Sequence, residues 1–514
     1  MKKVILIAFY FNQVNEIASK RLRALAKYLP RFGWEVIVIV PDLGFIPPEN
    51  KNLNSRIIVT EYEDMFSHMF NKFRSSNKND KIDEIGEIDK IGEIGEIDKN
   101  DLKESINWED NLDNSHNGGD FSQSSDDLNS TKLKDSSSVS NPIASKAISM
   151  AGEIFAYPDG MKYWHEPAFE AASKIVEEGE IDAIISSSWP ITCHTIAKDI
   201  SDKYNIPWIA DLRDLWNLNP YVSHTFIRDY FEKRLELKTF ENTDVLTTTT
   251  DLAAKTLATL HPNNRIVPIL SGYDEDDFKF LESVLNEDQG NGLENSSKKD
   301  GSLDYDASNV ESSSEKNGSL NHDASNVSAK LKLIYAGSLY GGKRDPTILF
   351  KAIRQLEDES KLDSSNISIE FYGDSGNLEE IARKYSLLDI VNIGGKIPHE
   401  EVLKKQLNSD VLLLISWNNE KEKMFIPGKI YEYFALRKPV LSIGYKEGSL
   451  KDLIEDTNVG YHVSDLESAK EVLLDIYNEF LESGKVEYKS EVNIDDYSML
   501  AMASKFADLL NDLA

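Results

Sequence analysis

The chain of 514 residues contains a single cysteine, Cys193. A disulfide framework and a cysteine-based zinc site are therefore excluded, and a reducing compartment suits the chain. The sequence has no run of about 18 apolar residues, so it predicts no membrane-spanning helix. We expect a cytoplasmic protein, and peripheral attachment to the inner face of the cell membrane stays open.

Positive charge is also scarce. The chain has 57 Lys and Arg against 88 Asp and Glu, a net charge of −31, so nucleic acid is not an expected partner. It lacks the glycine-rich dinucleotide and P-loop motifs, the hydrolase elbow and the zinc-protease pair of histidines. The acidic stretch 274–276 lies in a turn and is interpreted as a linker rather than a metal site. The residues thus mark no metal site, and we predict no resident cofactor.

Alternating strands and helices dominate what is present. Residues 3–8 and 34–40 are continuous apolar runs of strand length, and residues 19–32 between them have apolar positions at helical spacing. This strand–helix–strand unit is typical of parallel sheets, and the pattern recurs at 167–248 and at 331–443. The sequence thus predicts an α/β protein with two doubly wound, Rossmann-like domains that face a cleft.

We place the domain boundaries at 1–265 for the first domain, 266–496 for the second and 497–514 for a last helix that returns to the first. Two low-complexity stretches, at about 76–145 and about 281–329, interrupt the domains. Both are rich in repeats of Ser, Asn, Asp, Gly or Glu, a composition that buries too little apolar surface to offset the entropy of ordering. We predict that both are disordered insertions.

The loop that follows the strand at 331–336 is the first candidate binding site. It contains Gly337, Ser338, Gly341, Gly342, Lys343 and Arg344. Glycines let the backbone approach a phosphate, and the two cations would balance its charge. The alternative is an ordinary strand–helix loop with surface cations. Gly373, after the strand at 367–372, is added to this set.

A second candidate begins at Pro427 and Gly428, which open a helix. Lys429 lies in the first turn, where the helix dipole disfavours a cation unless an anion is bound nearby. Glu432 could accept hydrogen bonds from a ribose diol, or could simply be a favourable acid in an early helical turn.

The first half of the chain also has charged residues where strands end. Asp211, Arg213 and Asp214 follow one strand, and His194 begins a helix after another. His194, Asp211 and Arg213, with Lys343, are the catalytic candidates. An internal ion pair and a buried, hydrogen-bonded histidine are the competing interpretations. Ser19 and Arg21 begin the first long helix and, with Asp214, are candidates for the acceptor side.

Eight stretches in this order resemble glycosyltransferases of the GT-B type, in particular the large retaining family numbered four. They are ASKRLRALAKYLPRFGWEVIVI, IDAIISSSWPITCHTIAKDIS, PWIADLRDLW, SGYDEDDF, LIYAGSLYGGKRDP, IEFYGDSG, GGKIPHEEVL and PGKIYEYFALRKPVLSIG. Together they span nearly the whole chain outside the two insertions.

The resemblance implies hexosyl transfer, with retention and without a required metal, from a UDP- or GDP-sugar to a cell-surface polysaccharide or lipid-linked acceptor. The first domain would bind the acceptor and the second the nucleotide-sugar. Lys343 and Arg344 match the residues that hold the donor diphosphate, Gly337 the donor-loop glycine, and Glu432 the second of the paired glutamates of the family.

The chain departs from the family at Met424, which stands where the first of those glutamates is expected. That acid usually addresses the hydroxyls of the donor sugar, so the identity of the sugar is left open. Two alternatives also stay open, a nucleotide-sugar 2-epimerase on the same fold and a non-catalytic GT-B-like scaffold protein.

Overall fold

The computed structural model describes residues 1–14, 17–65, 67–68, 157–279 and 330–514. The described chain forms two compact units, residues 1–271 with 499–514 (unit 1) and residues 272–498 (unit 2). The insertions predicted at about 76–145 and 281–329 lie outside the described residues.

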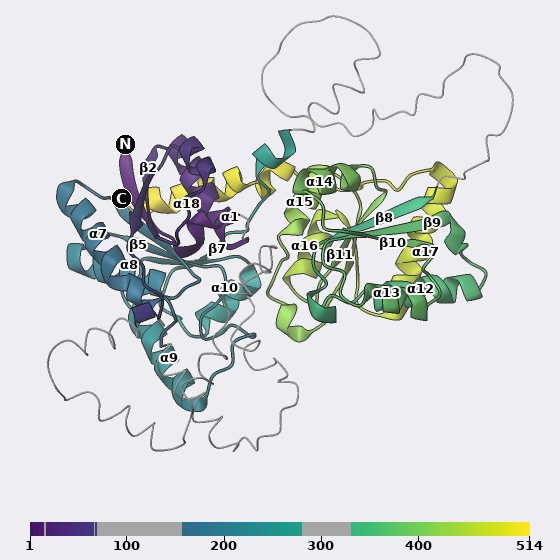
Figure 1. The fold of residues 1–514 in the computed structure, drawn as a ribbon, viewed down its shortest axis with the longest axis horizontal. Helices are drawn as coiled ribbons and strands as arrows, with labels where there is room; N and C mark the ends of the chain where they lie inside the picture. The colour runs from purple at the N-terminus through teal and green to yellow at the C-terminus, as the bar shows by residue number, and fades with distance from the viewer. Residues whose placement is uncertain (15–16, 66, 69–156, 280–329) are drawn as a thin grey trace, which may run out of the picture. The chain divides into compact units, whose positions relative to one another are not determined.

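Unit 1 is built on a seven-stranded parallel sheet in the order β3-β2-β1-β4-β5-β6-β7 (Figure 1). Its strands are β1 (Lys2–Ile7), β2 (Trp34–Pro41), β3 (Arg56–Thr60), β4 (Ala183–Ser187), β5 (Trp208–Leu212), β6 (Val245–Thr248) and β7 (Ile266–Pro268). Its helices are α1 (Ile17–Tyr28), α7 (His165–Glu178), α8 (Thr192–Tyr204), α9 (Phe226–Thr239), α10 (Asp251–Ala258) and α18 (Met499–Leu513).

One face of this sheet packs against α1 and against α18, the last helix of the chain. Val4 and Leu6 of β1 belong to the same buried cluster as Leu25 of α1 and Phe506 of α18. Because β1 and β2 are apolar on both faces, helices must cover both sides of the sheet, as parallel sheets require. The last helix is thus part of the core of unit 1.

Unit 2 contains a six-stranded parallel sheet in the order β10-β9-β8-β11-β12-β13. Its strands are β8 (Leu331–Ala336), β9 (Ile367–Tyr372), β10 (Val391–Gly395), β11 (Val411–Ile415), β12 (Val440–Ile443) and β13 (Gly460–Val463). Its helices are α12 (Thr347–Asp358), α13 (Leu378–Lys384), α14 (His399–Leu407), α15 (Lys429–Leu436), α16 (Ser449–Thr457) and α17 (Leu466–Ser483).

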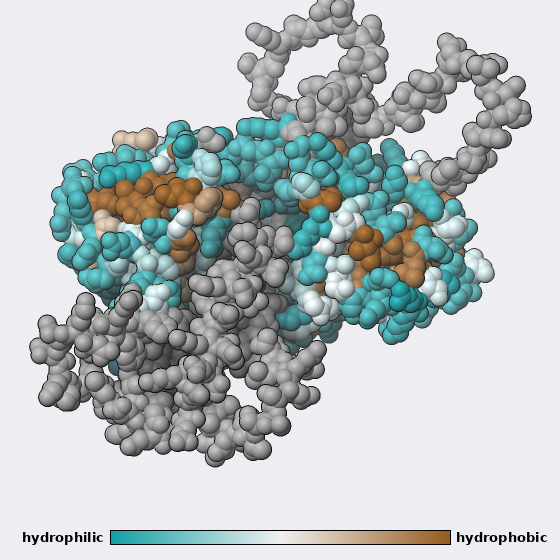
Figure 2. Space-filling model, viewed as in Figure 1, coloured by the Kyte–Doolittle hydropathy of each residue, from teal (hydrophilic) through white to brown (hydrophobic). Residues whose placement is uncertain are grey.

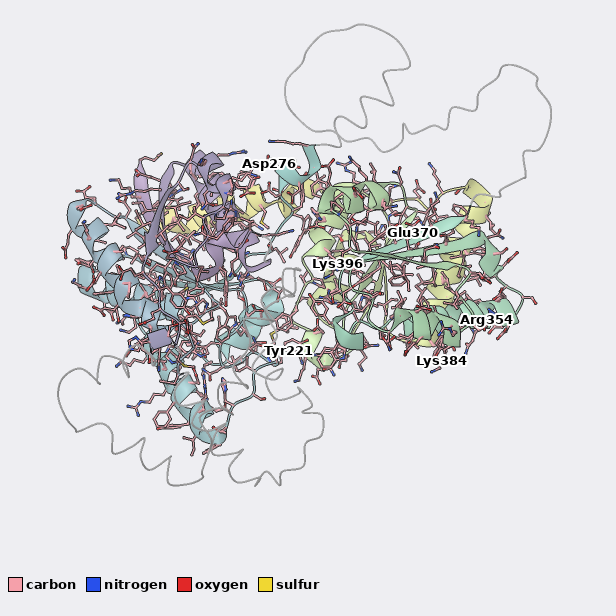
Figure 3. All side chains as sticks on the ribbon, viewed as in Figure 1. Tyr221, Asp276, Arg354, Glu370, Lys384 and Lys396 are labelled. Atoms are coloured by element: carbon pink, nitrogen blue, oxygen red, sulfur yellow. The ribbon has the colours of Figure 1, made fainter. Side chains whose placement is uncertain are left out.

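The helices α12, α13 and α17 share one buried cluster with the sheet of unit 2, and α12 packs along α17. Arg354 of α12, labelled in Figure 3, donates a hydrogen bond from Nη2 to the carbonyl of Ser386 at 3.4 Å. This bond links α12 to the turn after α13. Hydrophilic residues cover most of the face drawn in Figure 2, interrupted by separate apolar patches. The prediction of two parallel, doubly wound α/β sheets is confirmed.

Both sheets reverse their winding direction at one point, between β1 and β4 in unit 1 and between β8 and β11 in unit 2. Loops at the carboxyl ends of the two strands beside such a point diverge to opposite faces of the sheet and leave a crevice where ligands bind. In unit 2 these are the loops that begin at Gly337 and at Ser416. The strand order therefore supports the loop that begins at Gly337, the first candidate predicted from the sequence, as a ligand-binding loop.

Candidate functional site

The loop after β8 approaches the loop after β9 closely. A β-carbon built on Gly373, where φ is +111°, would stand 2.6 Å from the carbonyl oxygen of Gly337. The Gly337 amide donates to the carbonyl of Tyr372 at 2.7 Å, and the Leu339 amide donates to that of Asp374 at 3.0 Å. Only a residue without a side chain fits at 373, and the contact fixes the path of the β8 loop.

Lys429, in the first turn of α15, extends toward this loop. A β-carbon on Gly337 would overlap Lys429 Nζ, so the amine occupies the space that a side chain at 337 would fill. The same amine lies 4.8 Å from the centre of the Tyr335 ring, and the Tyr335 hydroxyl donates to the carbonyl of Ser338 at 2.8 Å. The two candidate segments predicted from the sequence, the glycine loop and the start of α15, are therefore adjacent.

The two cations of the loop itself, Lys343 and Arg344, each lie over an aromatic ring. Lys343 Nζ is 5.5 Å from the centre of the Trp417 ring, which follows β11, and Arg344 is 4.3 Å from that of Tyr340. Cation–π contact holds a charge in place over the face of a ring. The Lys343–Trp417 contact also joins the two loops on either side of the point where the winding of the sheet reverses.

Glu432 lies one turn into α15 with 16 % of its side chain exposed, and its Oε1 is 3.9 Å from Nε2 of His399 at the start of α14. Its neighbour Tyr433 is buried and donates to the carbonyl of Leu413 at 3.0 Å. Burial raises the pKa of Tyr433 well above its ordinary value, the charge of Glu432 adds to the rise, and Arg344 opposes it. Glu432 of α15 and Arg344 of the loop after β8 thus both act on the surroundings of Tyr433.

Met424, where the resembled family has a glutamate, is 7 % exposed. The backbone beside it is held in place, since the Ser449 amide donates to the carbonyl of Lys423 at 2.8 Å. A β-carbon on Gly448 would overlap that same carbonyl. An apolar side chain therefore packs at the position where the sequence resemblance predicts a carboxylate.

In unit 1, Asp211 is fully buried and forms a two-point ion pair with Arg21, whose Nε and Nη2 donate to Oδ2 and Oδ1 at 3.0 and 2.9 Å. The hydroxyls of Ser187 and Thr247 also donate to Asp211, at 3.0 and 2.8 Å. Burial raises the pKa of Asp211, but the Arg21 charge and these hydrogen bonds outweigh it and leave the pKa below its usual value.

His194 is fully buried among the rings of Trp208 and Phe240. The Ser186 hydroxyl accepts a hydrogen bond from Trp208 Nε1 at 2.8 Å, so its own proton points to His194 Nδ1, also at 2.8 Å. His194 is then a neutral imidazole with its proton on Nε2, which has no partner among the described residues. Burial lowers the pKa of His194 to about 3.

The remaining candidates of unit 1 are divided between core and surface. Ser19 is fully buried, whereas Arg213 and Asp214 are partly exposed after β5. Arg213 Nε donates to the carbonyl of Ser188 at 3.0 Å, in the loop after β4 beside the point where the winding reverses. With Arg21, Asp211 and His194 buried, Arg213 and Asp214 are the candidates of this set that have surface for a ligand.

Unit 1 also has an open hollow of about 1050 Å³ beyond the ends of β2 and β3. Its lining combines carboxylates, imidazoles and phenol rings, and His68 stacks on Tyr163 with 3.9 Å between ring centres. Carboxylate oxygens accept hydrogen bonds from hydroxyl groups and repel anions, and here they lie beside flat aromatic rings. The lining therefore suits a polyol better than an anion. The lining residues are Asp42, Gly44, Glu61, Tyr62, Glu63, His68, Lys162, Tyr163, His165, Glu166 and Pro167.

Sequence reasoning did not find Trp417, His399 or Asp374, which meet the candidate residues of unit 2. His399 lies in a stretch, GGKIPHEEVL, that carried the family resemblance, and this was the available signal. No group of three or more His, Cys, Asp or Glu able to hold a metal ion occurs within the residues that the structure describes.

No family model matches the chain, and no curated protein matches it in sequence. Among solved structures it is similar to sucrose-phosphate synthase of Thermosynechococcus elongatus, with 13 % identity over 100 % of this chain and 99 % of that one and a TM-score of 0.53. The fold is of the GT-B type.

Two other similar structures are weaker matches. Anabaena HepE in complex with UDP is 12 % identical, covers 100 % of both chains and has a TM-score of 0.49. WaaG, a glycosyltransferase involved in lipopolysaccharide biosynthesis, is 12 % identical, covers 99 % of both chains and has a TM-score of 0.44. At such identities the similarity concerns the fold alone.

Proposed function

We propose that the chain is a glycosyltransferase that moves a hexosyl group, with retention, from a UDP- or GDP-sugar to a cell-surface polysaccharide or lipid-linked acceptor. The observation that carries the proposal is the position of the Lys429 amine against the backbone of Gly337. It places a cation, a glycine loop and the N-terminus of α15 together beside the point where the sheet reverses its winding, which is a suitable setting for a diphosphate.

In this proposal Lys343, Arg344 and Lys429 bind the diphosphate of the donor. As the bond between the sugar and the diphosphate breaks, negative charge grows on the leaving nucleoside diphosphate, and fixed cations stabilise that charge in the transition state. The protein's own cations supply this stabilisation, so no metal is required. Glu432 accepts hydrogen bonds from the ribose hydroxyls.

The acceptor belongs to unit 1 in this proposal. Arg213 and Asp214 offer charge beside the loop after β4, and the hollow lined by Tyr62, Glu63 and Tyr163 offers rings and carboxylates for a saccharide. The buried Arg21–Asp211 pair and the buried His194 support this unit from within, and no proton transfer is assigned to them.

A thermal-shift panel of UDP, GDP and their sugars, with ADP as a control, tests the proposal. A nucleotide at about a hundred times its dissociation constant stabilises the folded state by about 2.7 kcal/mol, and we expect a melting temperature raised by about 5 °C or more. No shift with any uridine or guanosine nucleotide would refute the proposal.

The absence of any shift would favour the second candidate function, a non-catalytic scaffold. Met424 supports this candidate because it stands where an acid that binds the sugar is expected. A positive shift is followed by product analysis. Transfer that depends on an added acceptor supports the proposal, whereas conversion of the nucleotide-sugar without an acceptor identifies an epimerase. The anomeric configuration of the product, read by NMR, tests retention.

A further inference from the structure

The helix α9 presents its apolar side chains to solvent, which is the reverse of an ordinary surface helix. It protrudes from unit 1 (Figure 1). Five large apolar residues along its outer side are 40 to 85 % exposed, namely Phe226, Ile227, Tyr230, Phe231 and Leu237. Successive residues of a helix are about 100° apart, so these positions form one continuous stripe. Soluble proteins seldom expose such a stripe unless it meets a partner.

The inner side of α9 is polar and firmly bonded, so its orientation is well determined. Glu232 accepts from Trp216 Nε1 at 2.8 Å and from Arg228 Nε at 3.1 Å. Glu236 is fully buried, accepts from the Asn217 amide at 2.9 Å and lies 3.1 Å from His261 Nε2. Rotating the helix to bury its apolar stripe would break all these bonds.

The outer side of α9 is also basic. Lys233, Arg234 and Lys238 are exposed, against one exposed acid within the helix, Asp229, because Glu232 and Glu236 point inward. This local excess of cations occurs in a chain whose net charge is −31. By helical geometry Arg234 and Lys238 point in directions about 80° and about 120° from Phe226 around the helix, between Tyr230 at about 40° and Phe231 at about 140°, and so lie within the apolar stripe.

We propose that the outer side of α9 is a docking surface for an anionic lipid membrane. Aromatic and aliphatic side chains enter the boundary between headgroups and acyl chains, while Lys and Arg reach anionic headgroups. A second copy of the chain fits less well, since a symmetric contact would bring the cations of both helices together. The inference rests on the proposed function in one respect, because a membrane is where a lipid-linked acceptor is found.

Co-sedimentation of the full chain with vesicles tests the proposal. One set is phosphatidylcholine alone, and in the other about a third of the lipid is phosphatidylglycerol. We expect binding to the anionic vesicles, weakened by salt because the cations are exposed. The combined changes Lys233→Glu, Arg234→Glu and Lys238→Glu should reduce binding about tenfold or more. The combined changes Phe226→Gln, Ile227→Gln and Phe231→Gln should do the same.

Matched controls come from unit 2. Lys351→Glu, Lys384→Glu and Lys485→Glu change the net charge by the same amount at exposed positions, and Leu388→Gln, Ile393→Gln and Leu481→Gln remove the same number of exposed apolar side chains. Both control variants should bind vesicles as the parent chain does. A melting curve for every variant separates lost docking from lost folding.

Other results would overturn the proposal. These are no binding to anionic vesicles, equal loss in the α9 and control variants, or binding that appears only when residues 76–145 are deleted, which would mean that the chain covers its own helix. A dimer that the α9 variants convert to a monomer, without vesicle binding, would assign the surface to a second copy. Vesicle binding needs no nucleotide, so its failure is distinguishable from failure of the proposed glycosyltransferase activity.

Discussion

Lys429 lies against the backbone of Gly337, so that a β-carbon built on Gly337 would stand 2.8 Å from Lys429 Cε and would overlap Nζ. The two residues are 92 positions apart in the chain (429 − 337) and come from the two segments that the sequence marked as candidates for diphosphate binding. Their contact makes the proposed donor site accessible to direct test.

Gly337→Ala should displace the Lys429 amine and lower the affinity for UDP or GDP about tenfold or more, since a charged contact to phosphate is lost. Gly376→Ala is the matched control, because Gly376 also has a positive φ, of +51°, but a β-carbon there meets nothing within 4 Å. Both variants carry backbone strain, on the order of 1–3 kcal/mol each, because both glycines have a positive φ. Calorimetry should separate them, and equal loss of affinity in both would count against the role of Lys429.

Lys343→Ala should lower turnover about a hundredfold or more, because a cation that stabilises the leaving diphosphate is removed. The side chain is exposed and contacts Trp417 at the surface, so the melting temperature should change little. Lys351→Ala, at an exposed position of α12, should leave turnover unchanged. Unchanged turnover in Lys343→Ala, measured with the donor found by the thermal-shift panel, would contradict the assignment.

Glu432→Gln should weaken binding of a nucleoside diphosphate about tenfold, through loss of a charged hydrogen bond to the ribose, and should leave binding of inorganic pyrophosphate unaltered. Lys429→Ala should weaken both ligands, because it acts on the phosphates. Competition calorimetry with the two ligands distinguishes these patterns. A parallel loss of both ligands in Glu432→Gln would mean that the carboxylate only orders the start of α15.

Asp211→Asn should destabilise unit 1 by about 3 kcal/mol, because Arg21 is then left buried without a counter-ion. Asp512→Asn is the control, since the Arg265–Asp512 pair is half exposed and should contribute less than about 1 kcal/mol. Urea unfolding measures the free energy of unfolding of both variants. Similar midpoints would show that the Arg21–Asp211 pair does not stabilise the fold.

The stability of unit 1 should fall as the pH is lowered from neutral, in part through His194. In the unfolded chain this residue takes up a proton near its ordinary pKa of about 6.5, whereas burial holds its pKa at about 3 in the folded chain. The unfolded state therefore binds more protons between these values, and His194 should contribute a loss of about 1 kcal/mol between pH 7 and pH 5.5. His194→Gln should flatten this slope, while His399→Gln, at a half-exposed position, should keep it.

The central strands could be predicted from the sequence because they are apolar on both faces, as in WEVIVIV of β2 and VLLLI of β11. The edge strands β3 and β7 escaped prediction. Only one of the five residues of β3 is buried, and β7 has three residues, none of them buried, so neither strand has a continuous buried run. The helix α17 was also missed, although Asp465 and Ser468 form a capping box at its start.

The site was predictable where one loop contains its own chemistry, as the glycines and cations of 337–344 do. It was not predictable where two distant segments meet. Asp211 stands at a strand end, where a functional residue is expected, but its partner Arg21 is 190 positions away and only the fold brings them together. The same holds for Trp417, which reaches Lys343 because β11 lies beside β8.

The contact between Gly373 and Gly337 has a consequence for recognising relatives of this chain. Gly373 cannot gain a side chain without separating the loops after β8 and β9, and Gly337 cannot gain one without displacing the Lys429 amine. The two glycines and the lysine therefore form a three-residue signature. Its members are far apart in sequence, but steric contact fixes their positions relative to one another. Divergent chains that keep all three can be gathered by this signature even where overall identity has decayed, and those that lose the lysine alone become candidates for a changed ligand.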